Sequence, residues 1–270
     1  MAFSTPLSAD ERIERVRYNC LTFRGPRLKP FQGFRGRITI CGFGPSLVRT
    51  WGDIRGRVIS TSGAHDFLLD HGIVPTYHVE LDPRERKTRF LERSHPDVTY
   101  LLNSQCHPRA FELLRDRNVV MWHGFTDDDA ERQIKAIDAI EPGARLMAGG
   151  TNVGMRAIIV ARELGHTSYD LHGMDCCYEG RSQWAGEHYT PPHHTVQIDV
   201  DGRVFETSDL MMQSTDDFFN AMRMLPGCRF KLHGDGLLEA RLKLFNRDPK
   251  LALSKEWWKP VNFQLREVAA

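Results

Sequence analysis

The sequence has no apolar run long enough to cross a membrane. A crossing helix needs about 18 or more consecutive apolar residues, and every apolar stretch here is far shorter. The first 19 residues, MAFSTPLSADERIERVRYN, also lack the basic segment and the apolar segment of a secretory signal. We therefore expect a cytoplasmic protein without a membrane span.

An excess of charge of one sign is missing as well. The chain has 36 Lys and Arg against 35 Asp and Glu, which leaves a net charge of +1 at pH 7. Proteins that bind nucleic acid or anionic membranes through their overall field carry a clear positive excess. The composition supports neither class and leaves only a local basic pocket open.

Paired cysteines are absent too. The six cysteines contain no C-x-x-C pair, and the histidines of segment 180–194 do not have the spacing of a zinc site. In a chain of this size we expect reduced thiols that pack in the core or near a site. For adjacent Cys176 and Cys177, packing at a strand end is favoured over a reactive pair.

The sequence does contain a regular alternation of short apolar runs and helical patterns. Strands are predicted at 38–43, 57–62, 76–82, 98–103, 118–124 and 168–175. Helices separate them, and the strongest helical pattern is 152–165. Strands spaced in this way pair in parallel through right-handed crossovers. The predicted fold class is α/β: Rossmann-like, with a mainly parallel sheet flanked by helices.

Three parts are expected along the chain. Residues 1–36 form a polar lead-in that contains a short helix, and residues 37–245 form a Rossmann-like nucleotide-binding or transferase domain. The alternation breaks after the sixth strand, where a long loop precedes a hairpin with an Asp-Gly turn at 196–207. Residues 246–270 are expected to be a tail that packs on the body.

The turn after the first predicted strand is the first candidate site. Ligands of open parallel sheets bind beyond the carboxyl ends of the strands. There the sequence has Gly42, Gly44, Pro45 and Ser46. Glycines let the backbone approach a phosphate, and the following helix start offers free N–H groups. A plain turn is an equally supported interpretation. If the turn binds nucleotide, Gly44→Val should abolish binding and leave the fold largely intact.

Two carboxylates also stand at predicted strand ends. Asp82 follows the third strand, where it could hold a ribose hydroxyl or a metal ion, or cap the helix that begins at Pro83. Asp175 ends the sixth strand, just after Gly173. We expect both carboxylates at the same edge of the sheet as the glycine turn.

A second glycine pair precedes the strongest helix. The segment consists of Gly149, Gly150, Thr151 and Asn152. It predicts an anion-binding nest at a helix start. The alternative is simple capping by Thr151 or Asn152.

The long loop after the sixth strand suits a lid. It carries Trp184, His188 and Tyr189 among other aromatic and titratable residues. Imidazole titrates near neutral pH, so His188 is the candidate base, with Asp175 as the second catalytic candidate. A solvated loop histidine is the alternative interpretation.

Four segments together resemble a known family. They are ITICGFGPSL, VISTSGAHDFLLDHGIVPTYHVELDP, AGGTNVGMRAIIVARELGHTSYDLHGMDCCYEG and FKLHGDGLLEA. In order and spacing they resemble the domain of unknown function 115. That family includes archaeal 6-hydroxymethylpterin pyrophosphokinases and the motility accessory factors, which are associated with flagellin glycosylation. The chain is also similar to bacterial sialyltransferases that use CMP-sialic acid.

The resemblance implies roles for the glycine turns and two tyrosines. The turn at 42–46 would hold the nucleotide phosphate or ribose, and Gly150, Thr151 and Asn152 would line the nucleotide. Tyr178 and Tyr189 would donate hydroxyls to the donor phosphate, and His188 would be the lid base. Two departures stand out: Phe43 replaces an Asn of the sialyltransferases, and Asp82 stands where the pyrophosphokinases have paired aspartates.

The leading functional prediction is a glycosyltransferase-like enzyme that uses a nucleotide-activated, CMP-type sugar and an acceptor with a hydroxyl, and that needs no cofactor or metal. The alternative is a pyrophosphokinase that moves diphosphate from ATP, with Mg²⁺ on Asp82 and Asp175. A non-catalytic nucleotide-binding module is the third hypothesis. The sequence leaves a homo-oligomer open.

Overall fold

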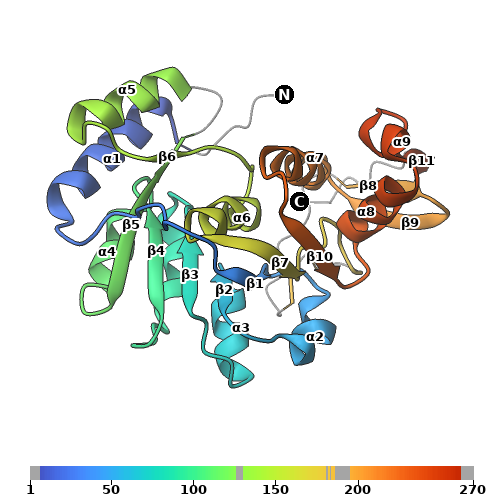
Figure 1. Cartoon of the computed structure of the whole chain (residues 1–270), viewed down its shortest axis with the longest axis horizontal. Coiled ribbons are helices and arrows are strands. Elements are labelled where there is room, and N and C mark those ends of the chain that lie inside the picture. The colour runs from blue at the N-terminus through green and yellow to red at the C-terminus, as the bar shows by residue number, and fades with distance from the viewer. Residues whose placement is uncertain (1–6, 126–129, 181, 183, 186–194, 263–270) are drawn as a thin grey trace, which may run out of the picture.

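An eight-stranded sheet forms the centre of the protein (Figure 1). The structure is a computed structural model and describes residues 7–125, 130–180, 182, 184–185 and 195–262. The strand order is β10-β7-β1-β2-β3-β4-β5-β6, and every pairing in this sheet is parallel. The predicted α/β Rossmann-like class is therefore confirmed.

The strands follow the apolar runs of the sequence. The sheet consists of β1 (Gly36–Cys41), β2 (Val58–Thr61), β3 (Tyr77–Glu80), β4 (Thr99–Asn103), β5 (Asn118–Gly124), β6 (Leu146–Met147), β7 (His166–His172) and β10 (Arg229–His233). The connections contain α2 (Leu47–Thr50), η1 (Trp51–Asp53), α3 (Ala64–Asp70), η2 (Glu85–Leu91), α4 (Pro108–Leu113), α5 (Ala130–Ile140), α6 (Val153–Glu163) and α7 (Asp209–Met224).

Alternate side chains of the strands face two layers of helices. On one face, Ile38 and Ile40 of β1 pack with α6 and α7 in the largest apolar cluster. On the other face, Cys41 packs with Leu47 of α2 and with α3. The helix α6 packs against β1, β2, β3 and β7, and its residues from Gly154 to Ala161 are all buried. This central position explains why its apolar pattern is the strongest in the sequence.

A second, antiparallel sheet lies beside the β10 end of the large one (Figure 1). It has the order β11-β8-β9 and contains the predicted hairpin, β8 (Val196–Val200) and β9 (Arg203–Thr207), with β11 (Lys259–Asn262). The helices α8 (Leu237–Arg247) and α9 (Pro249–Leu253) pack on it around Trp257. The described part of the tail contributes α9 and the strand β11, which pairs with β8 of the hairpin.

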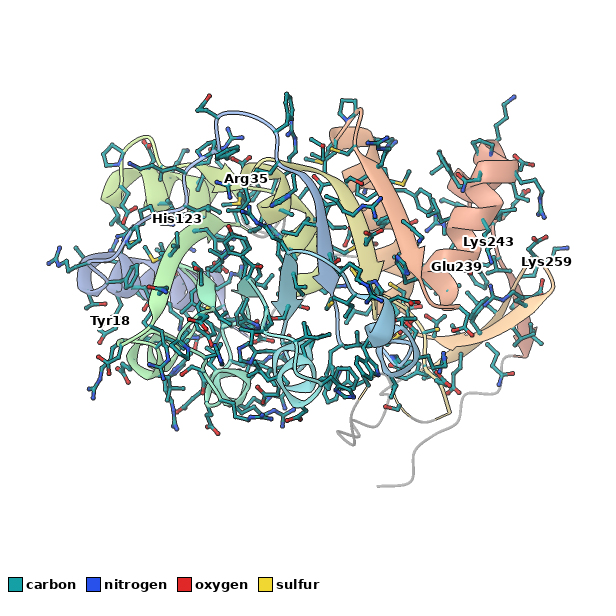
Figure 2. The ribbon with its side chains drawn as sticks, turned by 60° about the horizontal axis from the view of Figure 1, so that its bottom comes forward. Tyr18, Arg35, His123, Glu239, Lys243 and Lys259 are labelled. Atoms are coloured by element: carbon teal, nitrogen blue, oxygen red, sulfur yellow. The ribbon has the colours of Figure 1, made fainter. Side chains whose placement is uncertain are left out.

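The N-terminal helix and the second sheet lie at opposite ends of the molecule. Figure 2 shows Tyr18 and His123 at one end and Glu239, Lys243 and Lys259 at the other. The expected lead-in contains one helix, α1 (Ala9–Thr22), which begins with a capping box between Ser8 and Glu11 and packs on α5. Among the described residues, no helix is long and apolar enough to span a bilayer.

Candidate functional site

The strand order places a topological switch point between β1 and β7. The chain builds the sheet from β1 to β6 in one direction and then returns to add β7 on the other side of β1. Ligands of open parallel sheets bind beyond the carboxyl ends of the strands at such a point. The candidate turns at Gly42 and Gly173 leave these two strands.

The turns after β1 and β7 are bonded directly to each other. The backbone N–H of Gly42 donates to the carbonyl of His172 at 2.9 Å, and that of Gly44 donates to Gly173 at 2.8 Å. A Cβ atom at Gly42 would lie 2.5 Å from the Gly173 oxygen, and one at Gly44 would overlap Oδ2 of Asp175. The glycines therefore make room for the neighbouring turn. This gives a reason for Gly42 and Gly44 that does not involve a phosphate.

Asp175 holds the two turns in place. Its Oδ2 accepts a hydrogen bond from the backbone N–H of Ser46 at 2.9 Å. The side chain is only 7% exposed, and burial raises the pKa of its carboxyl. Because the carboxylate is engaged and enclosed, a positioning role suits it better than that of a solvent-facing base.

A third turn, after β10, closes over Asp175. The N–H of Leu238 donates to the Asp175 carbonyl at 3.2 Å, and a Cβ atom at Gly236 would overlap the Asp175 backbone. At the surface, Arg49 of α2 pairs with Glu179 and Asp235, both at 2.8 Å. The turns after β1, β7 and β10 thus form one connected structure.

The start of α6 lies next to these turns. Met174 connects them, because Cβ atoms at Gly42 and Gly154 would lie 3.1 Å and 3.3 Å from its side chain. The side chain of Asn152 caps the helix by accepting from Met155 N at 3.0 Å. Gly149 and Gly150 have φ values of +91° and +81°, a backbone conformation that favours glycine.

Residues of α7 already engage part of the predicted nest at the α6 start. The N–H of Thr151 donates to Oδ2 of Asp217 at 2.7 Å, and the hydroxyl of Thr151 lies 3.1 Å from that of Ser214. The capping interpretation therefore holds for Asn152, and binding of an external anion stays a prediction from the sequence. Asn152 is a helix cap, and a carboxylate takes one of the N–H groups that could bind an anion.

Asp82 lies at the same edge but belongs to another group of residues. Its Oδ1 accepts from the backbone N and from Nε of Arg84 at 2.9 Å and 2.8 Å, and its Oδ2 pairs with the same guanidinium. Oε1 of buried Glu80 accepts from the N–H of Asp82 at 3.1 Å. Burial, with the nearby Asp82 charge, raises the pKa of Glu80 to about 7.

Tyr178 lies toward the second sheet. Its backbone N–H donates to Glu206 of β9 at 2.8 Å, and burial raises the pKa of its hydroxyl. His188 and Tyr189 lie outside the described residues, so their roles stay predictions from the sequence.

Three further side chains lie together near the site: Phe43 and Lys87, which received no role from the sequence, and Trp184, which was expected in the lid. The rings of Phe43 and Trp184 are stacked, with centroids 6.5 Å apart and planes 21° apart. The N–H of Ala185 donates to the Phe43 carbonyl at 2.9 Å, which ties this segment to the turn after β1. Nζ of Lys87 lies 5.3 Å from the Trp184 ring. The sequence singled out Phe43 only as a departure from the sialyltransferases and Trp184 only as an aromatic residue of the expected lid, and no pattern singled out Lys87.

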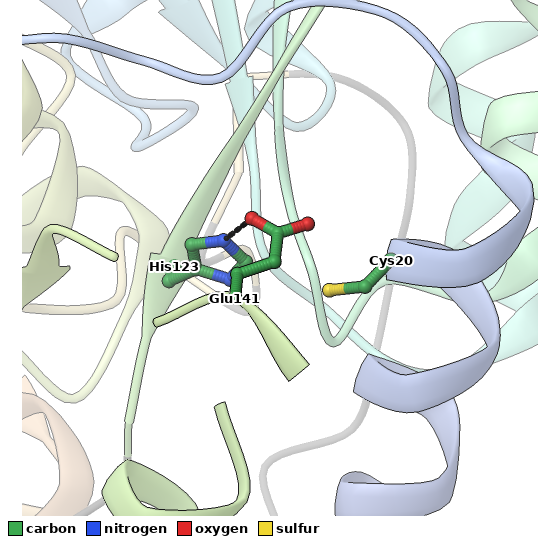
Figure 3. A group of neighbouring side chains, drawn as sticks. All are labelled: Cys20, His123 and Glu141. Carbon is green, nitrogen blue, oxygen red and sulfur yellow. Dashed lines mark hydrogen bonds and ion pairs between the residues drawn. The ribbon is translucent and has the colours of Figure 1, made fainter. Parts of the chain in front are cut away.

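A separate titratable cluster lies far along the sheet, at the end of β5 (Figure 3). Cys20, His123 and Glu141 place one potential metal-ligating atom each within 4.8 Å of the others. His123 Nε2 is 3.0 Å from Glu141, whose carboxylate also accepts from Nε of Arg27 at 2.9 Å. Burial raises the pKa of the Cys20 thiol to about 12. A guanidinium already neutralises the carboxylate, so the cluster is best explained as a network that joins α1 to β5.

The adjacent cysteines follow the favoured expectation. Burial raises the pKa of the thiols of Cys176 and Cys177, to about 12 for Cys177. All six cysteines are free. The two adjacent thiols are therefore packed, weakly ionised side chains at the end of β7.

Comparisons with known proteins agree with the fold. The solved MAf glycosyltransferase from Magnetospirillum magneticum AMB-1 matches 92% of this chain with a TM-score of 0.62 and 17% sequence identity. The chain spans only 42% of the length of that protein. No curated protein matches the sequence. The profile of one family, described as 6-hydroxymethylpterin diphosphokinase MptE-like, matches residues 15–181, well over half of the chain. The chain therefore belongs to the MptE-like family.

Proposed function

We propose that the protein is a transferase that moves a sugar from a nucleotide-activated, CMP-type donor to an acceptor hydroxyl. The observation that carries the proposal is the joining of the turns after β1 and β7 at the switch point, beside the start of α6. This edge offers the N-terminus of α6, which suits a phosphate, while the N–H groups of Gly44, Ser46 and Thr151 are already bonded within the chain. The fold shared with a glycosyltransferase favours a sugar as the transferred group.

The proposed reaction has one bond formed and one broken. The acceptor oxygen bonds to the anomeric carbon, and the bond from that carbon to the donor phosphate oxygen breaks. The nucleotide leaves with the electron pair, and the acceptor proton passes to a base, for which His188 is the candidate from the sequence. N–H groups at the α6 start would stabilise the leaving phosphate. Asp175 would keep the turn around Ser46 in position.

The family description favours a second candidate, transfer of diphosphate from ATP. Such chemistry needs Mg²⁺, which prefers oxygen ligands in a tight octahedron of about 2.1 Å radius. Asp82 is bonded to Arg84 through both of its carboxylate oxygens. Asp82 follows β3 and Asp175 follows β7, and the strands β1 and β2 lie between these two strands in the sheet. These two carboxylates therefore do not fit one shared ion, and we derive no step through a metal.

The two candidates make opposite predictions about metal dependence. The purified chain should be incubated with CMP-, UDP- and GDP-sugars and simple acceptors, with EDTA or Mg²⁺, and nucleotide release measured. We expect release from a CMP-sugar that persists in EDTA. Transfer from ATP to 6-hydroxymethylpterin that needs Mg²⁺ would replace the first proposal by the second. Calorimetric binding of a nucleotide without transfer under either condition would favour a non-catalytic nucleotide-binding module.

A further inference from the structure

Phe43, Lys87 and Trp184 come from three segments that meet beyond the sheet. Phe43 follows β1, Lys87 lies in η2 after β3, and Trp184 lies beyond β7. We call these three residues the ring subsite. Strands β1 and β3 both flank β2, so the subsite lies at the edge of the sheet where the candidate site lies.

The two aromatic rings of the subsite are held in a defined arrangement. They are half-buried and nearly parallel, with planes 21° apart. The Ala185 N–H to Phe43 carbonyl bond of 2.9 Å fixes the two segments together. Gly63 leaves the space that the Phe43 ring occupies, because a Cβ atom there would overlap the ring. Half-buried aromatic rings held in this way suit the stacking of a planar ring.

Lys87 adds a positive charge beside the rings. Its Nζ lies 5.3 Å from the Trp184 ring and 5.1 Å from the Phe90 ring. Within the described part of the chain, no carboxylate forms an ion pair with it, although Asp82 and Glu80 act on it from a distance. Burial lowers the pKa of the ammonium, since the charge is poorly solvated. An anionic group placed beside it would therefore be stabilised.

We propose that the ring subsite binds the planar heteroaromatic ring of the substrate on Phe43 and Trp184, and its nearest anionic group on Lys87. The assignment of the ring to a nucleotide rests on the proposed function. A pterin that carries a diphosphate has the same ring-and-anion chemistry, so the ligands of the test must distinguish the two sources.

The test measures binding by calorimetry to the full chain and to Trp184→Ala, Trp184→Phe, Phe43→Leu and Lys87→Ala. The ligands are CMP, cytidine, 6-hydroxymethylpterin and its diphosphate. Loss of an aromatic ring should weaken binding of the correct ring about tenfold or more, as for other stacked bases. Trp184→Phe should retain most of the affinity. Lys87→Ala should weaken binding of the phosphorylated ligand much more than that of the uncharged one.

The matched control is Arg89→Ala. Arg89 lies in the same short helix as Lys87, and its guanidinium lies 4.8 Å from the Phe90 ring, but it is exposed. The Arg89→Ala variant should bind all four ligands with the affinity of the unmodified chain. Circular dichroism should show that every variant is folded.

The outcomes separate the subsite from the proposed function. Binding of CMP that is equal in the unmodified chain, Trp184→Ala and Lys87→Ala overturns the subsite and leaves the donor proposal standing. Tight binding of the pterin diphosphate alone, lost in the same variants, supports the subsite and overturns the CMP-type donor. Failure of the unmodified chain to bind any of the four ligands overturns both.

Discussion

Gly44 shows how one missing side chain can decide the shape of the site. A Cβ atom at this position would overlap Oδ2 of Asp175 and approach Gly173 O to 2.7 Å. We expect Gly44→Ala to lower the free energy of unfolding by about 1–3 kcal/mol, the usual cost of forcing extra volume into a packed position. Urea denaturation measures this change. The sequence alone predicted that a larger residue here would leave the fold largely intact, and the structure adds a steric cost that this prediction did not include.

Gly52 provides the control for that experiment. A Cβ atom at Gly52 meets no atom within 4 Å. Gly52→Ala should therefore change the unfolding free energy little. Equal urea midpoints for the two alanine variants would show that the turns after β1 and β7 can separate without cost.

The places of the candidate site residues at strand ends could be predicted from the sequence, but the residues to which they are hydrogen-bonded could not. The positions of Gly42, Asp82 and Asp175 at strand ends follow from the alternation of apolar runs. That Asp82 is bonded to Arg84, and Asp175 to Ser46, depends on which turns face each other. Arg84 lies two residues from Asp82, and Ser46 lies 129 residues from Asp175. No periodic pattern in the sequence records either pairing.

At the scale of elements, β7 and β10 are joined by two stacked histidines. The rings of His172 and His233 lie 4.0 Å apart with planes 13° apart, and neither ring nitrogen of His172 has a hydrogen-bond partner among the described residues. Burial, and then the His233 charge, lower the pKa of His172 to about 4. A histidine in an unfolded chain has a pKa of about 6.5. The unfolded chain therefore takes up the proton first as the pH falls.

The pair predicts a loss of stability on the acid side of neutrality. The free energy of unfolding should be constant with respect to His172 above about pH 6.5 and fall as the pH is lowered toward 4. His172→Phe should reduce that fall, because phenylalanine keeps a ring on His233 without a titrating group. The measurement is urea denaturation over this pH range. The difference between the two proteins at high pH gives the packing cost of the substitution. An identical pH slope in both would mean that His172 does not contribute.

Most elements could be predicted from their apolar pattern, and the exceptions are short or paired at long range. The strands β1 to β5, β7 and the hairpin lie where alternating runs place them. The strand β6 has two residues, Leu146 and Met147, too few to show a period. Segment 85–91 forms a 3₁₀ helix rather than the predicted α-helix. The strand β11 exists because β8 offers it an edge, which the tail sequence does not reveal.

At the scale of the whole molecule, the cysteines are distributed through the core. Burial raises the pKa of Cys20, Cys41, Cys106, Cys176 and Cys177. Thiolates are the reactive form, so the native protein should show at most one fast-reacting thiol, half-buried Cys228, toward a disulfide reagent. All six thiols should react in guanidinium chloride. Cys228→Ser should remove any fast native phase, and a second fast thiol in that variant would contradict the packing at Cys176 and Cys177.

The insertion of β7 beside β1 has a consequence for how the protein is made. The turn at Gly42–Ser46 is completed by residues around Asp175 and Gly236. Synthesis proceeds at roughly 5–20 residues per second, so these residues leave the ribosome seconds after the turn. Until β7 arrives, one side of β1 presents unpaired backbone groups, an edge at which other chains can pair. The turn at the centre of the site is thus synthesised well before the residues that complete its contacts.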